Sequence, residues 1–203
     1  MGITIHYQGQ LKSTKLINRF KEEIMDISRI MKWKWQVLDE DWSYPATAQL
    51  SSHDDKLEII GHLPLKGIQI EIHPECEPLS LFFNAEGKLM TPILMVLINE
   101  GKITDDNLFV SVKTQFAPPD VHISIIKLLR YLKKRYILNL KVIDEGDYWD
   151  TDDKQKLIEK MTFLQDKIEK VSDIFASMDL EKLSQFSSEQ LAKILGERLK
   201  KKS

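Results

Sequence analysis

The chain has 203 residues, of which 42% are hydrophobic and 30% charged, and its formal net charge is −2. This composition predicts a soluble protein with one substantial core, and the charge argues against a strongly basic nucleic-acid-binding fold. A single cysteine, Cys76, excludes an internal disulfide framework and a multi-cysteine zinc cluster. Since no signal peptide and no run of about 18 apolar residues is found, we expect a cytoplasmic protein without a membrane span.

The first part of the chain predicts a strand, a helix and a second strand. Apolar and polar residues alternate over residues 3–8, which is typical of a strand with one buried face. Hydrophobic residues then recur at spacings of three and four from Leu16 to Met31, which indicates an amphipathic helix. Residues 35–40 follow as a strand, and residues 43–55 have the composition of a loop.

The middle of the chain predicts strands without intervening helices. Residues 56–63, 66–73 and 78–84 are strand-like, and the short proline-containing links between them favour an antiparallel meander. In the second of these strands the isoleucines are expected to face inward and Gln69, Glu71 and His73 outward. A short helix should begin near Thr91.

A second strand–helix–strand unit follows, with strands at residues 108–115 and 140–145. Its helix should start at Pro119 and carry one apolar stripe, formed by Ile125, Leu128, Leu129, Leu132 and Tyr136. Both units end in a Val–X–Asp–Glu sequence, which leaves open either an ancient duplication or two similar but unrelated turns. We therefore predict an α+β fold over residues 1–150. It would be a mixed, largely antiparallel sheet of two strand–helix–strand units around a β-meander, with helices on one face.

Residues 151–203 are expected to form a helical extension. Its apolar residues are spaced alternately by four and three, a heptad pattern that needs a partner surface. The helix is expected either to lie across the sheet or to pair with the same helix of another subunit. These residues are Leu157, Met161, Leu164, Ile168, Val171, Phe175 and Met178. Shorter helical pieces should follow residue 179, the last of them ending in the basic residues 198–202.

The acidic stretch VIDEGDYWDTDD, residues 142–153, resembles a cation site in composition only. Its spacing does not fit an EF-hand loop, and capping of a helix that begins near Asp152 explains most of the acidity. Asp144 and Glu145 differ, because they end a strand, where open sheets often bind ligands. We therefore take them as candidate ligand-binding residues.

A second candidate is the turn that contains His73, Glu75 and Cys76. These residue types can bind zinc or form a nucleophile with its base. No metalloprotease or cysteine-enzyme motif surrounds them, so a turn between two strands is the simpler interpretation.

The third candidate is the polar face of the predicted sheet. If the strands share one sheet, this face would bring together His6, Glu71, His73 and Lys113, with Gln8 and Gln115 as further ligand-binding candidates. His122, in the first turn of its helix, is a separate acid–base candidate. A face that is simply exposed to water is the alternative. Phosphate-binding glycine loops and serine-hydrolase motifs do not occur, so the sequence indicates no particular cofactor or metal.

Several segments resemble a group of uncharacterised bacterial proteins of similar length. They are residues 74–80 (PECEPLS), 112–117 (VKTQFA), 119–122 (PDVH), 128–133 (LLRYLK) and 144–151 (DEGDYWDT). The resemblance spans most of residues 1–153 and implies a bacterial cytoplasmic protein. No activity is assigned to that group, so no catalytic role is carried over.

Three functions follow from these patterns. The leading prediction is a non-enzymatic interaction or regulatory protein that acts through its C-terminal helices. The alternative is a small-molecule enzyme, in particular a metal-dependent hydrolase, that uses the polar sheet face. The third is a nucleic-acid accessory protein that uses the basic residues of the second helix, Arg130, Lys133, Lys134 and Arg135, together with the terminal lysines. A solvated helix face is the simpler interpretation of these basic residues.

Overall fold

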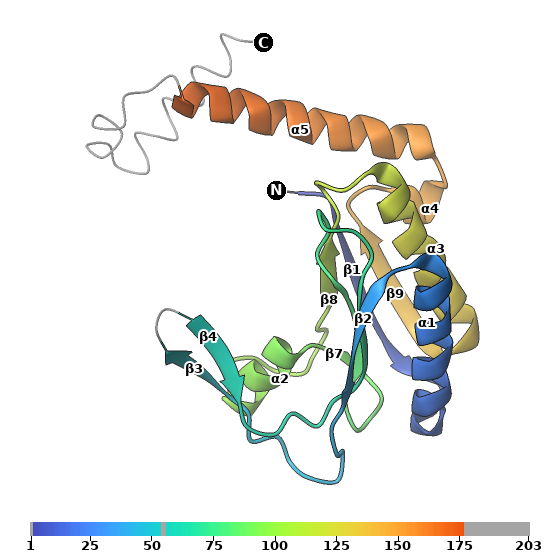
Figure 1. Ribbon diagram of the computed structural model, residues 1–203, viewed down its shortest axis with the longest axis vertical. Coiled ribbons are helices and arrows are strands. Elements are labelled where there is room, and N and C mark those ends of the chain that lie inside the picture. Colours follow the sequence, from blue (N-terminus) through green and yellow to red (C-terminus); the bar gives the residue numbers. More distant parts are fainter. Residues whose placement is uncertain (1, 54–55, 177–203) are drawn as a thin grey trace. The chain divides into compact units, whose positions relative to one another are not determined.

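A computed structural model describes residues 2–53 and 56–176 of the chain. The chain divides into two compact units, Met1–Lys154 and Gln155–Ser203. The first unit combines helices with antiparallel strands, which confirms the predicted α+β class (Figure 1). Among the described residues, none of the helices has the length and apolar character that a bilayer-crossing segment needs.

The strands of the first unit form three sheets rather than the single sheet that we predicted. One sheet has β1 (Thr4–Leu11) between β8 (Val110–Lys113) and β9 (Ile137–Asp144), and both pairings are antiparallel. The second has the order β2-β5-β6-β7 and the third is the hairpin β3-β4. The bounds of these strands are β2 Lys34–Asp39, β3 Gln49–His53, β4 Lys56–Ile60, β5 Lys66–Glu71, β6 Leu79–Phe83 and β7 Leu89–Met90.

Strand β3 lies in the segment 43–55 that we predicted as a loop, so that prediction is wrong. Its sequence, QLSSH, lacks the apolar alternation from which a strand is recognised. The strand conformation comes from antiparallel pairing with β4, in which Gln49 lies opposite Ile60. Pairing with a later segment leaves no local signal in the sequence.

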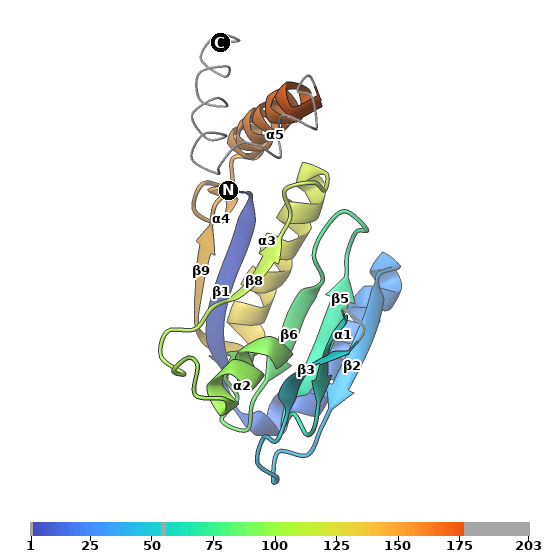
Figure 2. The same cartoon turned by 90° about the vertical axis from the view of Figure 1, so that its left-hand side faces the viewer.

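The first two sheets lie side by side, with β6 next to β8 (Figure 2). The backbone N–H of Glu77 donates to the carbonyl of Lys113 at 3.0 Å, and the N–H of Lys113 donates to Oε2 of Glu77 at 2.8 Å. The buried Tyr7 hydroxyl donates to the carbonyl of Ser80 at 2.6 Å. These hydrogen bonds join the two sheets without a continuous strand ladder.

Side-chain alternation along the strands agrees with the sequence. Ile3, Ile5 and Tyr7 are all at most 2% exposed, as predicted for one face of β1. In β5, Ile68 and Ile70 are buried. Gly67 in β5 has φ 150°, and a Cβ there would lie 2.1 Å from the Leu81 carbonyl oxygen, so glycine lets β5 approach β6 closely.

Helices α1 (Ile17–Met31) and α3 (Pro119–Arg135) cover the same side of these sheets (Figure 1). A short 3-10 turn, η1 (Thr14–Leu16), precedes α1. The Phe20 ring of α1 packs edge-on against Phe83 at 5.2 Å and Tyr136 at 5.4 Å between centroids. The predicted stripe of α3 is buried throughout. In α1, however, Lys21 and Ser28 are buried and the predicted stripe residue Met31 is 49% exposed.

Helix α2 (Pro92–Asn99) packs on the opposite face, so the short helix does not share the side of α1 and α3. Its Met95 belongs to a buried cluster with Leu65, Phe82 and Met90. Strand β6 is therefore buried on both faces. The Thr91 hydroxyl accepts from the N–H of Leu94 at 3.2 Å, which confirms the predicted helix start.

The chain continues through α4 (Tyr148–Thr151) into α5 (Lys154–Ala176). Helix α5 is continuous over 23 residues, so a long helix forms where the sequence predicts one. The shorter helices that we predicted after residue 179, and the basic end at residues 198–202, lie outside the described residues.

Candidate functional site

The structure does not bring the five acid–base candidates together. His6 lies on β1 and Glu71 on β5, and these strands belong to different sheets. His73 follows β5 in a turn, and His122 is buried in α3. The common polar face that the sequence predicts is thus divided between sheets.

The four candidates other than His122 each have a different neighbour. The Nε2 atom of His6 lies 4.0 Å from Oε1 of Glu145. A distance of 3.7 Å separates Oε2 of Glu71 from the Lys34 ammonium. The Nδ1 atom of His73 accepts from the N–H of Glu75 at 3.2 Å. The Nζ atom of Lys113 lies 5.3 Å from the centre of the Phe116 ring.

Cys76 has the properties of a structural thiol. Burial, together with the nearby charge of Glu77, raises its pKa to about 11. The thiol donates to the carbonyl of Glu77 at 3.1 Å. Within residues 2–53 and 56–176, no group of three or more histidine, cysteine, aspartate or glutamate side chains could hold a metal ion. The turn at residues 73–76 therefore offers neither an activated nucleophile nor a three-ligand zinc site.

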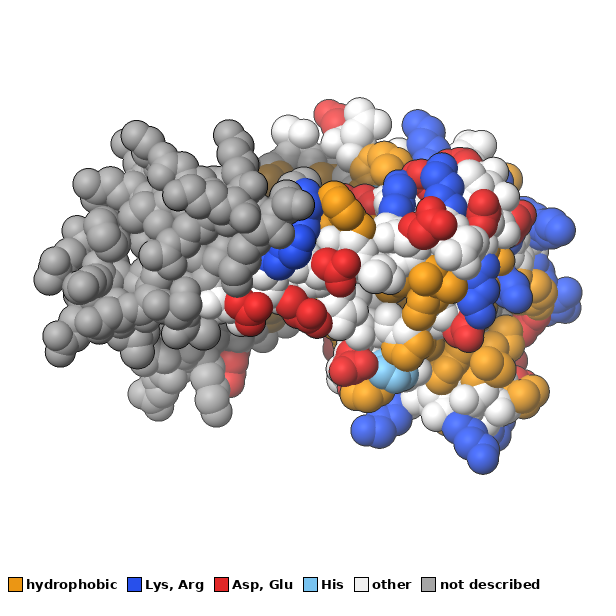
Figure 3. All heavy atoms as spheres, turned by 90° about the horizontal axis from the view of Figure 1, so that it is seen from above, with side chains coloured by type: hydrophobic (Ala, Val, Ile, Leu, Met, Phe, Trp, Pro, Cys, Tyr) orange, Lys and Arg blue, Asp and Glu red, His pale blue; other side chains and the backbone are white. Residues whose placement is uncertain are grey.

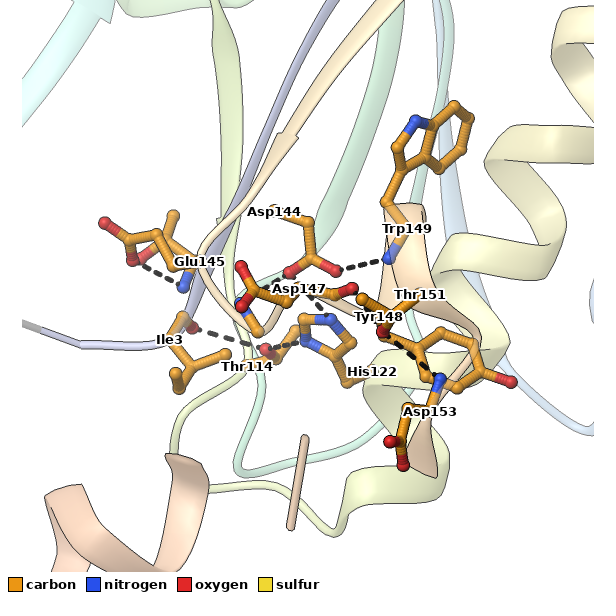
Figure 4. Close-up of polar contacts among 12 residues, drawn as sticks. Ile3, Thr114, His122, Asp144, Glu145, Asp147, Tyr148, Trp149, Thr151 and Asp153 are labelled. Carbon is orange, nitrogen blue, oxygen red and sulfur yellow. Dashed lines mark hydrogen bonds and ion pairs between the residues drawn. The ribbon is translucent and has the colours of Figure 1, made fainter. Parts of the chain in front are cut away.

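His122 of α3 and Asp144 of β9 form a buried pair (Figure 4). The His122 Nε2 atom lies 3.0 Å from Oδ1 of Asp144, and both side chains have no exposed surface. The sequence selected both residues, but for separate roles. The fold brings together the first turn of α3 and the last residue of β9.

Thr114 completes this cluster on the other side of the imidazole. Its hydroxyl lies 2.7 Å from Nδ1 of His122 and 3.2 Å from the carbonyl oxygen of Ile3, to which it can donate. If His122 carries protons on both nitrogens, it forms an ion pair with Asp144 and donates to Thr114, and Thr114 donates to Ile3. If Nδ1 is unprotonated, it accepts the Thr114 proton instead. Both protonation states are compatible with these contacts.

The Asp144 carboxylate has further donors from the backbone. Oδ1 accepts from the N–H of Gly146 at 2.7 Å, and Oδ2 accepts from the N–H of Trp149 at 2.8 Å. Burial alone would raise its pKa, but the hydrogen bond and charge of His122, with these two N–H groups, hold the pKa below its usual value. The carboxylate is therefore ionised and also satisfies a donor at the start of α4.

These contacts explain much of the acidic stretch at residues 142–153 without a cation. Asp144 serves the imidazole and α4, and Oε2 of Glu145 accepts from the N–H of Thr4 at 2.8 Å. The Thr151 hydroxyl accepts from the N–H of Asp153 at 3.2 Å immediately before α5. Because His122 and Asp144 are fully buried, the cluster fits a structural role that joins β1, β8, α3 and β9.

Gln115 is placed next to this region rather than on an open face. It is 6% exposed, and its side-chain amide has no hydrogen-bond partner in the described part of the chain. Its Oε1 packs so closely on Gly2 that a Cβ there would lie 2.2 Å away. The predicted ligand-binding residue Gln115 lines neither the cavity beside Gln8 nor the cavity beside α2.

Gln8 is the one predicted ligand-binding residue that lines a described cavity. This cavity has a volume of about 320 Å³ and lies on the outer side of β1 and β9. Its polar lining consists of Gln8, Gln10, Lys88, Asp105, Asp106, Asn107, Asn139 and Lys141. Such a mixture of amides with both charges suits a small polar ligand that both donates and accepts hydrogen bonds.

Local backbone geometry shapes this cavity. The pairing of β1 with β9 shifts between Gln8 and Gln10, and Asn139 at the shift has φ 50°. A β-bulge of this kind bends the strand and turns side chains in a new direction. The Lys88 ammonium forms an ion pair with Asp105, which raises the pKa of Lys88.

Sequence reasoning missed Thr114 and most of the cavity residues. The polar run at residues 104–107 (TDDN) is the only local signal that marks part of the cavity wall. Two of the basic residues of α3 have acceptors within the fold: Arg130 donates to the Trp149 carbonyl at 2.6 Å, and Nε of Arg135 lies 3.0 Å from Oε2 of Glu23. Figure 3 shows acidic and basic side chains interspersed on the described part of the face seen from above.

Comparisons with protein-family models, with curated proteins and with solved structures give no match to this chain.

Proposed function

We propose that this protein is a non-enzymatic interaction module that self-associates through α5. The observation that carries this proposal is the apolar spacing of four and three, which continues along a single 23-residue helix onto exposed residues. Among the apolar residues with this spacing, Ile168 keeps 41% of its surface exposed. Leu157 and Met161 are buried, so the surface available for pairing is the later part of the helix.

The chemistry of α5 favours a second copy of the same helix as the partner. In a parallel pair, Ile168 would occupy an a position and Leu164 a d position, which is a combination that favours two strands. The flanking positions would place Lys160 opposite Gln165 and Lys167 opposite Ser172 of the second copy. These pairs avoid like-charge repulsion, so the helix edges do not oppose parallel pairing.

Sedimentation of the full chain tests this function. We expect the wild-type protein to sediment as a dimer at about 50 µM, because this concentration exceeds a dissociation constant in the low micromolar range. Ile168→Asp should sediment as a monomer, because a charge would lie in the apolar contact. Asp166→Asn, which changes an exposed residue on another side of the same helix, should remain a dimer. A monomeric wild type would refute the proposal.

A small-molecule function through the sheet face remains the second candidate, supported by the cavity beside Gln8. A ligand from a library of polar metabolites should raise the melting temperature of wild type and not that of Gln8→Ala. We keep the bacterial cytoplasm as the proposed location, consistent with the free thiol of Cys76.

A further inference from the structure

We infer that a second cavity, next to α2, binds an amphipathic organic cation, that is, an apolar body carrying a protonated amine. The cavity has a volume of about 560 Å³. The lining residues that decide its chemistry are Trp42, Tyr44, Met90, Met95, Ile98 and Glu86. They come from the segment after β2, from β7, from α2 and from the turn between β6 and β7.

The aromatic wall of this cavity is held in place by contacts outside it. The Trp42 indole N–H donates to the carbonyl of Phe83 at 3.2 Å. The Tyr44 ring packs edge-on against His62 at 6.2 Å between centroids, and Nε2 of His62 lies 2.8 Å from the carbonyl oxygen of Asp41. A ligand would meet a Trp42 ring that is already positioned, so little conformational entropy of this ring is lost on binding.

The floor of the cavity is apolar and continuous with a buried cluster. Met90 and Met95 belong to the cluster that also contains Leu65 and Phe82. Methionine side chains adapt their shape to a ligand, because they are unbranched and polarisable. A volume of about 560 Å³ falls within the range of sites for small organic molecules. This surface suits a single aromatic ring or a short alkyl chain.

The charge of the lining selects the sign of the ligand. Its charged residues are Glu86 and Asp105, and no lysine or arginine lines it. Asp105 is already paired with the Lys88 ammonium. The backbone of Glu86 is fixed, since its carbonyl accepts from Nε2 of Gln10 at 2.6 Å. Glu86 is therefore the lining carboxylate that a cation can meet. The Lys66 ammonium already lies 5.5 Å from the centre of the Trp42 ring, so Tyr44 is the ring that adds attraction for a bound cation.

An anionic ligand of the same size would be repelled by the Glu86 carboxylate, and a neutral one would gain only the apolar contact. Tyr44 is 64% exposed and can be truncated with little effect on the fold. Glu86 is likewise exposed, so its substitution should leave the core intact. These two positions separate the aromatic and the electrostatic contributions to binding.

Titration of the full chain with three probes tests the inference. The probes are 2-phenylethylammonium, the neutral 2-phenylethanol and the anionic 3-phenylpropionate, and binding is followed by the NMR signal of the Trp42 indole N–H, which Trp42→Phe identifies. We expect saturable binding of the ammonium, with an affinity about fivefold above that of the alcohol and no binding of the carboxylate.

The variants give the decisive comparison. Glu86→Gln should remove the preference of the ammonium over the alcohol, Tyr44→Ala should weaken both, and the exposed Glu22→Gln on α1 should change neither. Equal affinity for the ammonium and the alcohol, comparable binding of the carboxylate, an unchanged preference in Glu86→Gln, or no saturable shift up to about 10 mM ammonium would each overturn the inference.

Discussion

Nε2 of His122 and Oδ1 of Asp144 lie 3.0 Å apart, and neither side chain has any exposed surface. A buried charge is costly unless it is paired and hydrogen-bonded, and Asp144 meets both conditions through His122, Gly146 and Trp149. This pair ties the first turn of α3 to the end of β9.

Asp144→Asn should lower the free energy of unfolding by about 3 kcal/mol, because it removes the charge that pairs with the imidazole and places an amide N–H₂ among hydrogen-bond donors. Urea denaturation followed by circular dichroism measures the change. The nearby exposed Asp150→Asn should stay within about 0.5 kcal/mol of wild type. Similar effects of the two substitutions would show that the buried pair contributes nothing specific.

Stability should also respond to acid through Asp144. Its pKa is lower in the folded state, so its contribution is complete above the unfolded-state value of about 4 and is lost as the pH falls through the folded-state pKa. The difference in unfolding free energy between wild type and Asp144→Asn should shrink as the pH falls below about 4. A difference that persists unchanged to about pH 2.5 would contradict this assignment.

Lys21 and Asp39 offer a second pair, in which only the cation is buried. The Lys21 side chain is 8% exposed, and its Nζ lies 2.6 Å from Oδ2 of Asp39. The hydrogen bond from Lys21 leads the contributions that lower the pKa of Asp39, with Lys66 adding to it. Asp39→Asn should destabilise the protein by about 2 kcal/mol, because the buried ammonium loses its counter-ion.

The double variant Lys21→Met/Asp39→Asn provides the control for this pair. Methionine has a similar length and no charge to be compensated, so the double variant should be more stable than Asp39→Asn alone. Guanidinium unfolding of wild type, both single variants and the double variant gives the coupling energy. Strictly additive effects would mean that the two groups do not interact.

Cys76 should react slowly with alkylating agents. With a pKa of about 11, its thiolate fraction at pH 8 is far below that of an ordinary thiol. We expect carboxamidomethylation by iodoacetamide at least about tenfold slower than for a short cysteine peptide, and an ordinary rate once the chain is unfolded in urea. Mass spectrometry over time measures both rates. A rate in the folded protein that equals the peptide rate would point to an accessible, reactive thiol.

Much of the local structure follows from the sequence. The alternation of residues 3–8 predicts β1 and its buried face, and the stripe from Ile125 to Tyr136 predicts the packing of α3. The Thr91 cap likewise marks the start of α2. In each case the side-chain period of the backbone acts within a few residues, so it can be detected in one segment of the chain.

The exceptions depend on partners that are distant in sequence. Lys21 and Ser28 interrupt the apolar stripe of α1, and Lys21 is tolerated there because Asp39 of β2 neutralises it. Strand β3 has no strand pattern and exists through its pairing with β4. Neither the Lys21–Asp39 pair nor the pairing of β3 with β4 can be recognised from the residues of α1 or β3 alone.

The sequence by itself determined the α+β class and the two long helices of the first unit, and it marked His122 and Asp144 as candidate site residues. Only the tertiary structure decided that the strands divide among three sheets, that His6 and Glu71 belong to different sheets, and that His122 meets Asp144 and Thr114 in the core. The physical reason is that side-chain periodicity is local, whereas strand pairing and burial depend on segments that meet only when the whole domain packs.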